Sequence, residues 1–507
     1  MKKTLLLLIL NFGFLFFAFS QNATVSFNIK NTASNKAEIV YLNDRLITNH
    51  LKKAKVEIAL IKEQPTLYSL SISEPQFIQF SCDSAQSNNS KSISYTFFIS
   101  PNDHLFFEAD FKQADFGFSI TGKGEENNQP MIGLSSGLDL QKYYHDTLPD
   151  RVLPIILANE HEKNIRLQKY IKTYKPTQSF IAASQNNLKY LACHDYYLFA
   201  EGNKFKIKGA YKRNYSRWQH ITDSLFANLK LNSDKALNSY IYRELVGTFL
   251  FREKERLWAN SQDHPEQFYR TWYNTDQVRG ANLFNDDPNN LLQEKIINKN
   301  FTGKVAEYAF GVLFDMAFDD SDFKNLPFIF ERFKAKYPRS KYVTWFSAPI
   351  SEVIQNKGKK LSLFVVFAIQ NGTNLQTFKD LLSIVKGKTV LLDMWGTWCG
   401  PCRSETEKNG EAIKEYFKDK GLEFLYVANY DLKNEKQWKE LIAYYGMTGT
   451  HVLANERLTQ DIMANLKSKG YPTYAIIHKN GDIEISKAGY PMDRQILINQ
   501  LEQALKE

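Results

Sequence analysis

Residues 389–403, TVLLDMWGTWCGPCR, carry the pattern that decides the fold. Thr389 to Met394 form an apolar run interrupted by one carboxylate, which predicts a buried β-strand. Cys399 and Cys402 follow at C-x-x-C spacing, where a helix is predicted to begin. The unpaired N–H groups and the dipole of a helix N-terminus stabilise a thiolate at the first cysteine, and the second lies one turn on. The stretch therefore predicts reversible dithiol–disulfide chemistry at a strand-to-helix junction.

Half of a zinc site is the alternative interpretation, because zinc sites use the same C-x-x-C spacing. The chain has 4 cysteines in 507 residues and no second pair at this spacing. No histidine lies at ligand spacing near Cys399. Redox chemistry is therefore favoured, and the sequence predicts neither a metal nor a cofactor.

The segment Leu392 to Glu405 resembles the active-site segment of thioredoxin-fold proteins. It is most similar to exported thiol-disulfide oxidoreductases of the TlpA/ResA type, which often show W-x-x-W-C-x-P-C-R-x-E. Trp395, Arg403 and Glu405 fit that pattern. The resemblance extends over roughly residues 360–507 and implies a thioredoxin fold.

The resemblance implies roles for three residues. Cys399 attacks a partner disulfide, and Cys402 then resolves the mixed disulfide. Asp393, six residues before Cys399, matches the buried acid of thioredoxins and would accept the Cys402 proton; the alternative is an aspartate that caps a neighbouring backbone group. The thioredoxin lysine on the next strand is replaced here by Val427. Glu407 stands where the family often has a helix-kinking proline, so a straighter helix is expected.

The sequence also predicts a substrate-binding surface around the cysteines. Pro472 resembles the family's cis-proline, which leaves the backbone of the preceding residue free to pair with a substrate chain. An ordinary trans proline at the start of a strand is the alternative. Trp398 is expected to shape the docking surface, whereas Trp395 is expected to pack. The predicted substrate-binding residues are Trp398, Gly400, Pro401, Tyr471 and Pro472.

The first 20 residues have the features of a secretory signal peptide. Lys2 and Lys3 precede an apolar run at 5–17, and an A-x-S cleavage-like site follows at 18–20. An uncleaved anchor is the alternative, although the run is short for a membrane span and contains Asn11. No cysteine follows the site, so the lipoprotein route lacks its acceptor. These features predict export to the bacterial periplasm or cell envelope, with membrane contact only through this segment if it stays uncleaved.

Length and composition indicate several domains without disulfide staples. A chain of 507 residues is too long for one core. The net charge of +9 is mild and no dense Lys/Arg block occurs, which argues against nucleic-acid binding. Cys82 and Cys193 lie in apolar contexts and are predicted to be structural, with a bridge between them as the alternative.

The chain before the thioredoxin-like part has two regions, which differ in the period at which apolar residues recur. Residues 21–126 alternate with period two, which predicts an antiparallel β-sandwich. Its segments FFISPNDHLFFEAD and ITGKG weakly resemble β-rich modules that precede thioredoxin domains in Bacteroidetes envelope proteins. Such a module suits partner or cell-wall docking, and a purely structural packing role is the alternative.

Residues 127–357 have the helical period and predict an all-α domain. A helix is expected over 179–199, ending before Gly202, and a loop is expected over 282–290. Residues 358–507 form the predicted thioredoxin-like domain, in which Asn371-Gly372 indicates a hairpin turn.

The sequence as a whole predicts a periplasmic thiol-disulfide oxidoreductase that acts on protein disulfides or dithiols. Its Cys-Gly-Pro-Cys motif resembles that of reducing members of the family, so a reductant supplied by a membrane-delivered electron donor is expected. Two alternatives remain open. One is an envelope binding protein with a redox-sensing thioredoxin domain, and the other is a thiol peroxidase.

Overall fold

The computed structural model describes residues 22–61, 64–84, 91–129, 138–144, 146, 148–368 and 375–507. The predicted signal peptide at 1–20 and the predicted turn at 371–372 lie outside these residues. The chain separates into two compact units, Met1–Arg45 with Lys52–Val246, and Leu46–Leu51 with Gly247–Glu507. Within the described ranges, no helix combines the length and apolar character needed to cross a bilayer.

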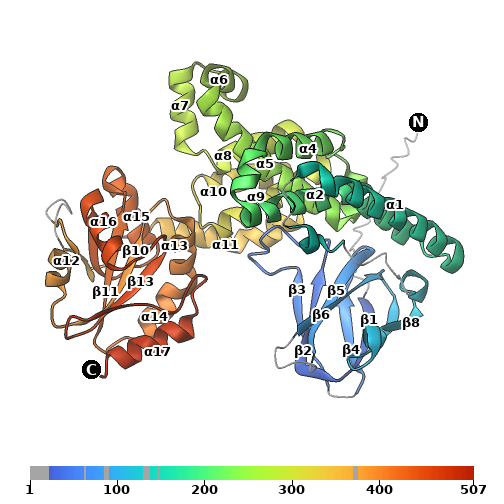
Figure 1. Ribbon diagram of the computed structural model, residues 1–507, viewed down its shortest axis with the longest axis horizontal. Coiled ribbons are helices and arrows are strands. Elements are labelled where there is room, and N and C mark those ends of the chain that lie inside the picture. Colours follow the sequence, from blue (N-terminus) through green and yellow to red (C-terminus); the bar gives the residue numbers. More distant parts are fainter. Residues whose placement is uncertain are drawn as a thin grey trace, which may run out of the picture. The chain divides into compact units, whose positions relative to one another are not determined.

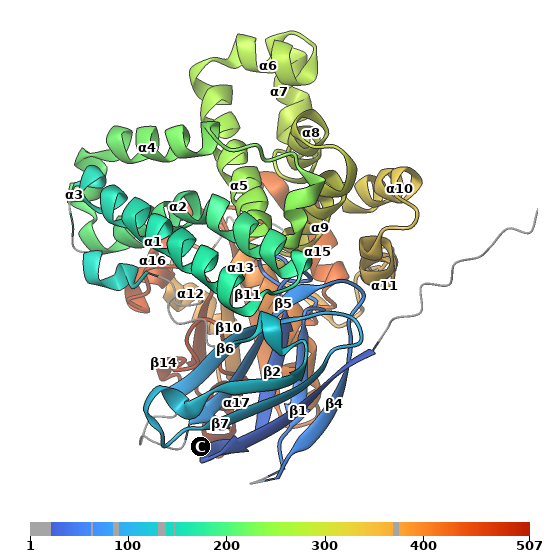
Figure 2. The ribbon, with the colours of Figure 1, turned by 90° about the vertical axis from the view of Figure 1, so that its right-hand side faces the viewer.

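The first unit opens with two four-stranded sheets packed face to face (Figure 1). Figure 2 shows these strands, in blue, from a second side. The sheet orders are β4-β1-β7-β8 and β3-β2-β5-β6. All pairs are antiparallel except β1 with β7. The strands are β1 Asn22–Lys30, β2 Thr32–Tyr41, β3 Lys55–Ala59, β4 Thr66–Ser71, β5 Gln76–Ser84, β6 Lys91–Ile99, β7 His104–Asp110 and β8 Ser119–Lys123.

The inward residues of the two sheets form one apolar core, as their period-two pattern predicts. Phe80 stands at its centre, with its ring centroid 5.1 Å from those of Phe27 and Phe107. Cys82 lies in the same core, and Cys193 is buried in a helix of the same unit. They form no bridge, so the alternative of a Cys82–Cys193 disulfide is wrong and both thiols act as small buried side chains.

The helices of the first unit follow the sandwich in sequence. They are α1 Pro149–Tyr174, α2 Gln178–Ile207, α3 Gly209–Arg213, α4 Tyr215–Ala227 and the start of α5 Tyr240–Asp263. The prediction that α2 ends before Gly202 is wrong. A Cβ atom on Gly202 would meet the Tyr144 ring at 2.7 Å, so this glycine permits close packing and does not end the helix.

The second unit continues α5 and adds α6 Pro265–Tyr273, α7 Gln277–Asp286, α8 Asn290–Asn300, α9 Gly303–Asp319, α10 Leu326–Lys336 and α11 Lys341–Lys357. The loop predicted over 282–290 is mostly helical, and only residues 287–289 lie outside helices. The Asp287 carboxylate explains the short turn, because its Oδ1 accepts the N–H groups of Asn289 and Asn290 at 3.0 and 2.8 Å.

The C-terminal part of the second unit is a six-stranded sheet in the order β14-β13-β10-β11-β12-β9. β10 runs parallel to β11 and antiparallel to β13, and it is buried at every position. Its elements are β9 Val365–Phe367, α12 Phe378–Ile384, β10 Thr389–Trp395, α13 Gly400–Glu405, a π-helical turn Thr406–Gly410, α14 Glu411–Tyr416, β11 Leu422–Asn429, α15 Glu435–Tyr444, β12 Gly449–Ala454, α16 Glu456–Asn465, β13 Thr473–Ile477, β14 Ile483–Ile485 and α17 Arg494–Ala504. This is the α/β thioredoxin arrangement with β12 and α16 inserted before β13.

Alternate residues of β10 point to opposite faces of this sheet and enter different cores. Leu392 and Met394 pack with α12 and α16. Leu391 packs on the other face with α14 and α17. Asp393 shares the period of Leu391 and so lies on the face that carries the helix following the cysteines.

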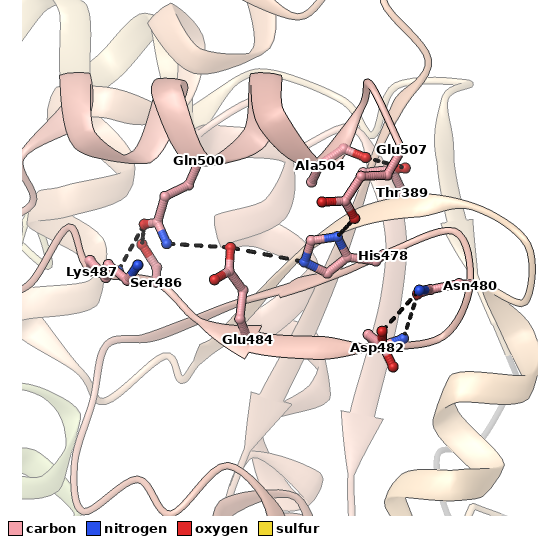
Figure 3. Close-up of polar contacts among 10 residues, drawn as sticks. All are labelled: Thr389, His478, Asn480, Asp482, Glu484, Ser486, Lys487, Gln500, Ala504 and Glu507. Atoms are coloured by element: carbon pink, nitrogen blue, oxygen red, sulfur yellow. Dashed lines mark hydrogen bonds and ion pairs between the residues drawn. The ribbon is translucent and has the colours of Figure 1, made fainter.

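The C-terminal helix closes the sheet through polar contacts (Figure 3). Gln500 on α17 donates to Glu484 of β14 at 3.4 Å and accepts the Lys487 N–H at 2.8 Å. His478, after β13, lies 2.7 Å from the Glu507 carboxylate. These contacts fix the β13–β14 hairpin, which positions the segment before β13 next to the cysteines.

Candidate active site

Cys399 and Cys402 lie where β10 gives way to α13, and they form a disulfide with Cα atoms 5.3 Å apart. Cys399 is the N-cap of α13, and its Sγ accepts the backbone N–H of Cys402 at 3.2 Å. Pro401 occupies the first turn, where its missing N–H costs nothing. The cysteines are 3% and 1% exposed. The predicted dithiol pair is thus assembled at a helix N-terminus.

The turn that leads from β10 to Cys399 is held by polar side chains at the end of β11. Asp431 accepts the Thr397 N–H at 2.7 Å and the Thr397 hydroxyl at 2.6 Å. Asn429 donates to the Trp395 carbonyl at 2.9 Å. Burial raises the pKa of Asp431, while the Thr397 donors act in the opposite direction. Sequence reasoning missed both residues, although polar residues after a buried parallel strand are a usable signal.

Aromatic side chains border the disulfide. Trp398 is 50% exposed, and its ring centroid lies 5.3 Å from that of Tyr471 in an edge-on arrangement. The peptide bond between Tyr471 and Pro472 is cis, as predicted. A Cβ atom on Gly396 would meet the Trp398 indole nitrogen at 2.4 Å, so the glycine makes room for this ring. The exposed Tyr430 ring lies 6.2 Å from Trp398 and extends the aromatic surface.

The carboxyl group of Asp393 is buried beneath the sheet face that carries α13 and α14. Its register partners are Tyr426 on β11 and Tyr474 on β13. Its Oδ1 atom is buried without a hydrogen-bond partner, which does not fit the alternative of a backbone cap. Burial raises the pKa of Asp393 to about 7, and the ammonium group of Lys414 opposes that rise.

Lys414, from α14, supplies the positive charge near Asp393 that β11 lacks at Val427. Its Nζ lies 5.2 Å from the centroid of Tyr426, the register partner of Asp393, and donates to the Gly446 carbonyl at 3.1 Å. Burial lowers the pKa of Lys414 to about 8, and Asp393 opposes that shift. No sequence signal indicates this pairing, because it joins a helix to a strand.

A small, mainly apolar cavity with a few polar side chains in its lining adjoins Asp393. Its volume is about 30 Å³, and its lining includes Asp393, Glu405, Asn409 and Tyr426. A cavity of this size with several polar neighbours has room for a water molecule. Asp393 and Glu405 thus line the same small cavity.

The helix that begins at Cys399 is not a continuous α-helix. A π-helical turn at Thr406–Gly410 separates α13 from α14, and the expectation of a straighter helix at Glu407 stays a prediction. The Thr406 hydroxyl donates to the Cys402 carbonyl at 3.0 Å, and Glu407 accepts from Ser321 at 2.5 Å. A π turn widens the helix locally without a proline.

Metal ligands do not gather around the cysteines or elsewhere in the described parts of the chain. No group of three or more His, Cys, Asp or Glu side chains is placed there to hold an ion. The sulfur atoms of Cys399 and Cys402 are joined to each other. The arrangement suits dithiol–disulfide exchange.

Comparison with known proteins places the same segment in a family. Residues 357–505 match the Redoxin family. The chain is 37% identical over 89 residues to the thiol-disulfide oxidoreductase ResA of Bacillus cereus, covering 15% of this chain and 47% of ResA. It is 34% identical over 114 residues to ResA of Geobacillus kaustophilus, covering 22% and 61%.

Solved structures include similar domains. The thioredoxin domain of a thiol-disulfide oxidoreductase from Bacteroides vulgatus is 27% identical, with a TM-score of 0.22, and the match covers 24% of this chain and 84% of that one. The chain spans about half the length of the first curated relatives it matches, 47% to 59%. The family match and the ResA similarity thus show that residues 357–505 are similar to the thioredoxin-fold domains of TlpA/ResA-like oxidoreductases.

Proposed function

We propose that this protein is an exported thiol-disulfide oxidoreductase that reduces disulfides in protein substrates. One observation carries the proposal. Cys399 and Cys402 form a disulfide at the N-terminus of α13, next to the strand that carries a buried carboxyl group and beside an exposed aromatic surface. The similarity to proteins named thiol-disulfide oxidoreductases supports the same chemistry.

The exchange proceeds in two substitutions at sulfur. In the reduced protein, the Cys399 thiolate attacks one sulfur of the substrate disulfide, forms a mixed disulfide and releases the other substrate sulfur as a thiolate. The Cys402 thiolate then attacks the Cys399 sulfur, which re-forms the Cys399–Cys402 disulfide and releases the second substrate thiolate. Two electrons pass from the protein dithiol to the substrate. A dithiol reductant must return them before the next cycle.

Asp393 is the group that takes the proton of Cys402 before the second substitution. A carboxyl group with a pKa of about 7 changes its protonation state near neutral pH, where a general base works best. Glu405 lines the same small cavity as the buried acid. Cys399, Cys402 and Asp393 are thus the proposed catalytic residues.

Substrate segments bind beside the disulfide along the residues before β13. The Tyr471 backbone, next to Pro472, pairs with an extended substrate chain in the manner of an added strand. Trp398 provides an apolar contact area, and Gly400 and Pro401 belong to the surface next to Cys399. This mode of binding recognises backbone more than side chains.

The proposed direction of transfer is reduction, and the proposed compartment is the bacterial periplasm or cell envelope. Cys-Gly-Pro-Cys resembles the motif of reducing thioredoxin-like proteins, and the chain begins with a signal-like segment. An oxidising compartment holds few free thiols. The electrons therefore come from a membrane-delivered dithiol donor.

A trapping experiment tests the exchange. The Cys402→Ser variant of the full chain, expressed in its own envelope, should accumulate mixed disulfides through Cys399, whereas Cys193→Ser should accumulate none. The reduction potential of the Cys399/Cys402 pair tests the direction. A value near about −270 mV supports a reductant, and one near about −120 mV contradicts it. Failure to trap any partner through Cys399 would count against exchange itself.

A further inference from the structure

The connection between α9 and α10 lies against the redox helix within the second unit. The Asp320 carbonyl oxygen accepts a hydrogen bond from Arg403 Nη2 at 3.2 Å. The same oxygen stands 3.6 Å from the position that a Cβ atom would take on Gly400. A methyl group added to Gly400, the residue that follows Cys399, would thus be in van der Waals contact with backbone of the helical region.

Side-chain contacts hold both ends of the connection between α9 and α10 in place. Ser321 is 3% exposed, and its hydroxyl donates to Glu407 of the π-helical turn at 2.5 Å. The Phe323 ring packs on Tyr444 of α15 with centroids 5.6 Å apart. The Phe323 carbonyl accepts from Lys357 at 2.9 Å. We call residues 320–323 the α9–α10 wall, because both its ends are held against the thioredoxin-like part.

The helix that leads into the wall is anchored as well. Residues Leu46–Leu51 belong to the same unit. Asp315 near the end of α9 accepts the N–H groups of Thr48, Asn49 and His50 at 2.8 to 2.9 Å. His50 also lies 3.6 Å from the Asp319 carboxylate. These contacts keep the C-terminal end of α9 in place.

Aromatic side chains beside the disulfide are exposed to solvent, although the disulfide itself is buried. Trp398 and Tyr430 are 50% and 54% exposed, whereas Cys399 itself is only 3% exposed. Thiol–disulfide exchange depends on access to the attacking sulfur. When a substrate disulfide lies in the surface of a folded protein, the atoms around it collide with the wall before the disulfide sulfur reaches Cys399. A disulfide in an extended segment can enter along Tyr471 as a strand.

We propose that the α9–α10 wall is a specificity determinant, which restricts the protein to disulfides carried on extended, flexible segments and excludes those set in folded surfaces. The inference rests on the proposed exchange at Cys399 and names the class of its substrates. The bonds that form and break are unchanged. The wall acts only on the approach of the substrate.

Alkylation of the reduced full chain tests the wall without any substrate. The rate at Cys399 is measured with iodoacetamide and with a maleimide that carries a long polyethylene glycol chain, and the adducts are located by mass spectrometry. The ratio of the two rates is compared with that for an unhindered cysteine peptide. We expect the bulky reagent to be disfavoured at Cys399 by about tenfold or more beyond the peptide's ratio. A ratio equal to that of the peptide overturns the proposal.

Variants then assign the effect to the wall. Ser321→Ala with Phe323→Ala removes one hydrogen bond and one ring contact, and the bulky-to-small ratio should rise about tenfold. Ser351→Ala with Phe328→Ala is the matched control on α10 and α11, because both residues are exposed and lie outside the wall. If the double variant does not fold, Ser321→Gly is the milder test, since Ser321 has a φ of +49° that glycine adopts without strain. Equal ratios in native and wall variants overturn the assignment.

Turnover separates this proposal from the proposed function. The same disulfide is offered in a linear peptide and in a folded protein, and kcat/KM is measured for both. A clear preference for the peptide, which shrinks in the wall variant, supports the wall. Equal turnover of both substrates contradicts the wall but not the exchange. Absence of turnover on both contradicts the exchange, and the alkylation ratio still decides about the wall.

Discussion

Asp315 and Asp393 are both buried carboxyl groups in the second unit, and their surroundings are opposite. Asp315 is 1% exposed and accepts hydrogen bonds from three backbone N–H groups and one hydroxyl of residues 48–50. Asp393 is 7% exposed, and its Oδ1 has no hydrogen-bond partner. The first carboxylate is paired as a structural group must be, and the second is not.

The difference separates a structural acid from a chemical one. Hydrogen bonds to a carboxylate stabilise its charged form. Burial raises the pKa of both groups, but at Asp315 the donors of residues 48–50 act against the rise. Asp393 has no such donors, and burial raises its pKa to about 7. Burial alone does not identify an active-site acid. The absence of hydrogen-bond donors to the buried carboxyl group distinguishes Asp393 from Asp315.

The largest effect is expected at Asp393. Its folded-state pKa of about 7 lies above the ordinary value of 3.8, so the unfolded state releases the proton first as the pH rises. The free energy of unfolding of the oxidised chain should therefore fall by up to about 4 kcal/mol between about pH 4 and pH 8. Asp393→Asn should remove that fall and be the more stable form at pH 8. Urea unfolding across this pH range measures it, with the exposed Asp263→Asn as control. An unchanged slope in Asp393→Asn would refute the assignment.

Replacement of Asp315 should act in the opposite direction. Asp315→Ala leaves the donors of residues 48–50 without their acceptor, so the free energy of unfolding should fall by about 3 kcal/mol. The folded fraction should keep its reduction potential. Denaturant unfolding and redox titration of the same sample give both quantities. A shifted reduction potential with an unchanged free energy of unfolding would mean that Asp315 acts on the redox site and is not a structural acid.

Asp431 is an intermediate case, since it is fully buried but holds the turn before Cys399. Thr397→Val removes the hydroxyl donor and keeps the backbone one. The free energy of unfolding should fall by about 2 kcal/mol, the cost of a hydrogen bond to a charged group. Stability measured against the exposed control Thr271→Val checks this value. No loss would show that the hydroxyl contact contributes nothing.

The smallest effect concerns Lys414. Its positive charge opposes the rise of the Asp393 pKa, so Lys414→Met should raise that pKa further, by about one pH unit. The shift is measured from the infrared absorption of the protonated Asp393 carboxyl group as a function of pH. The pH at which half of this absorption is lost, the midpoint, gives the pKa. Lys414→Arg keeps the charge and should restore the native midpoint, and the exposed Lys408→Met should leave it unchanged. A midpoint that does not move in Lys414→Met would remove Lys414 from the site.

Each part of the site that was predictable is marked by a short stretch of sequence. The strand at Thr389–Trp395 and the cysteine pair follow from a short pattern, and the cis bond at Pro472 was implied by the resemblance to the family. Asp393 was implied by the same resemblance, through its position six residues before Cys399. Such features depend on local backbone geometry, which a few neighbouring residues determine.

The residues that sequence reasoning missed contact the site across long separations. Asp431 is 34 residues from Thr397, and Asn429 is 34 residues from Trp395. Lys414 acts on Asp393 from a different element, the helix α14. Tertiary packing also explains why α2 continues through Gly202. Contacts between residues far apart in sequence cannot be predicted from the periodicity of apolar residues.

The central position of β10 has a consequence for amide hydrogen exchange. Every residue from Thr389 to Trp395 is buried, and neighbouring strands are hydrogen-bonded on both sides. Amides of this kind exchange with solvent only when the whole domain opens. The strand that carries Asp393 should therefore be among the slowest-exchanging segments in both redox states. The disulfide at Cys399 can therefore form and break while the strand β10 keeps its hydrogen bonds.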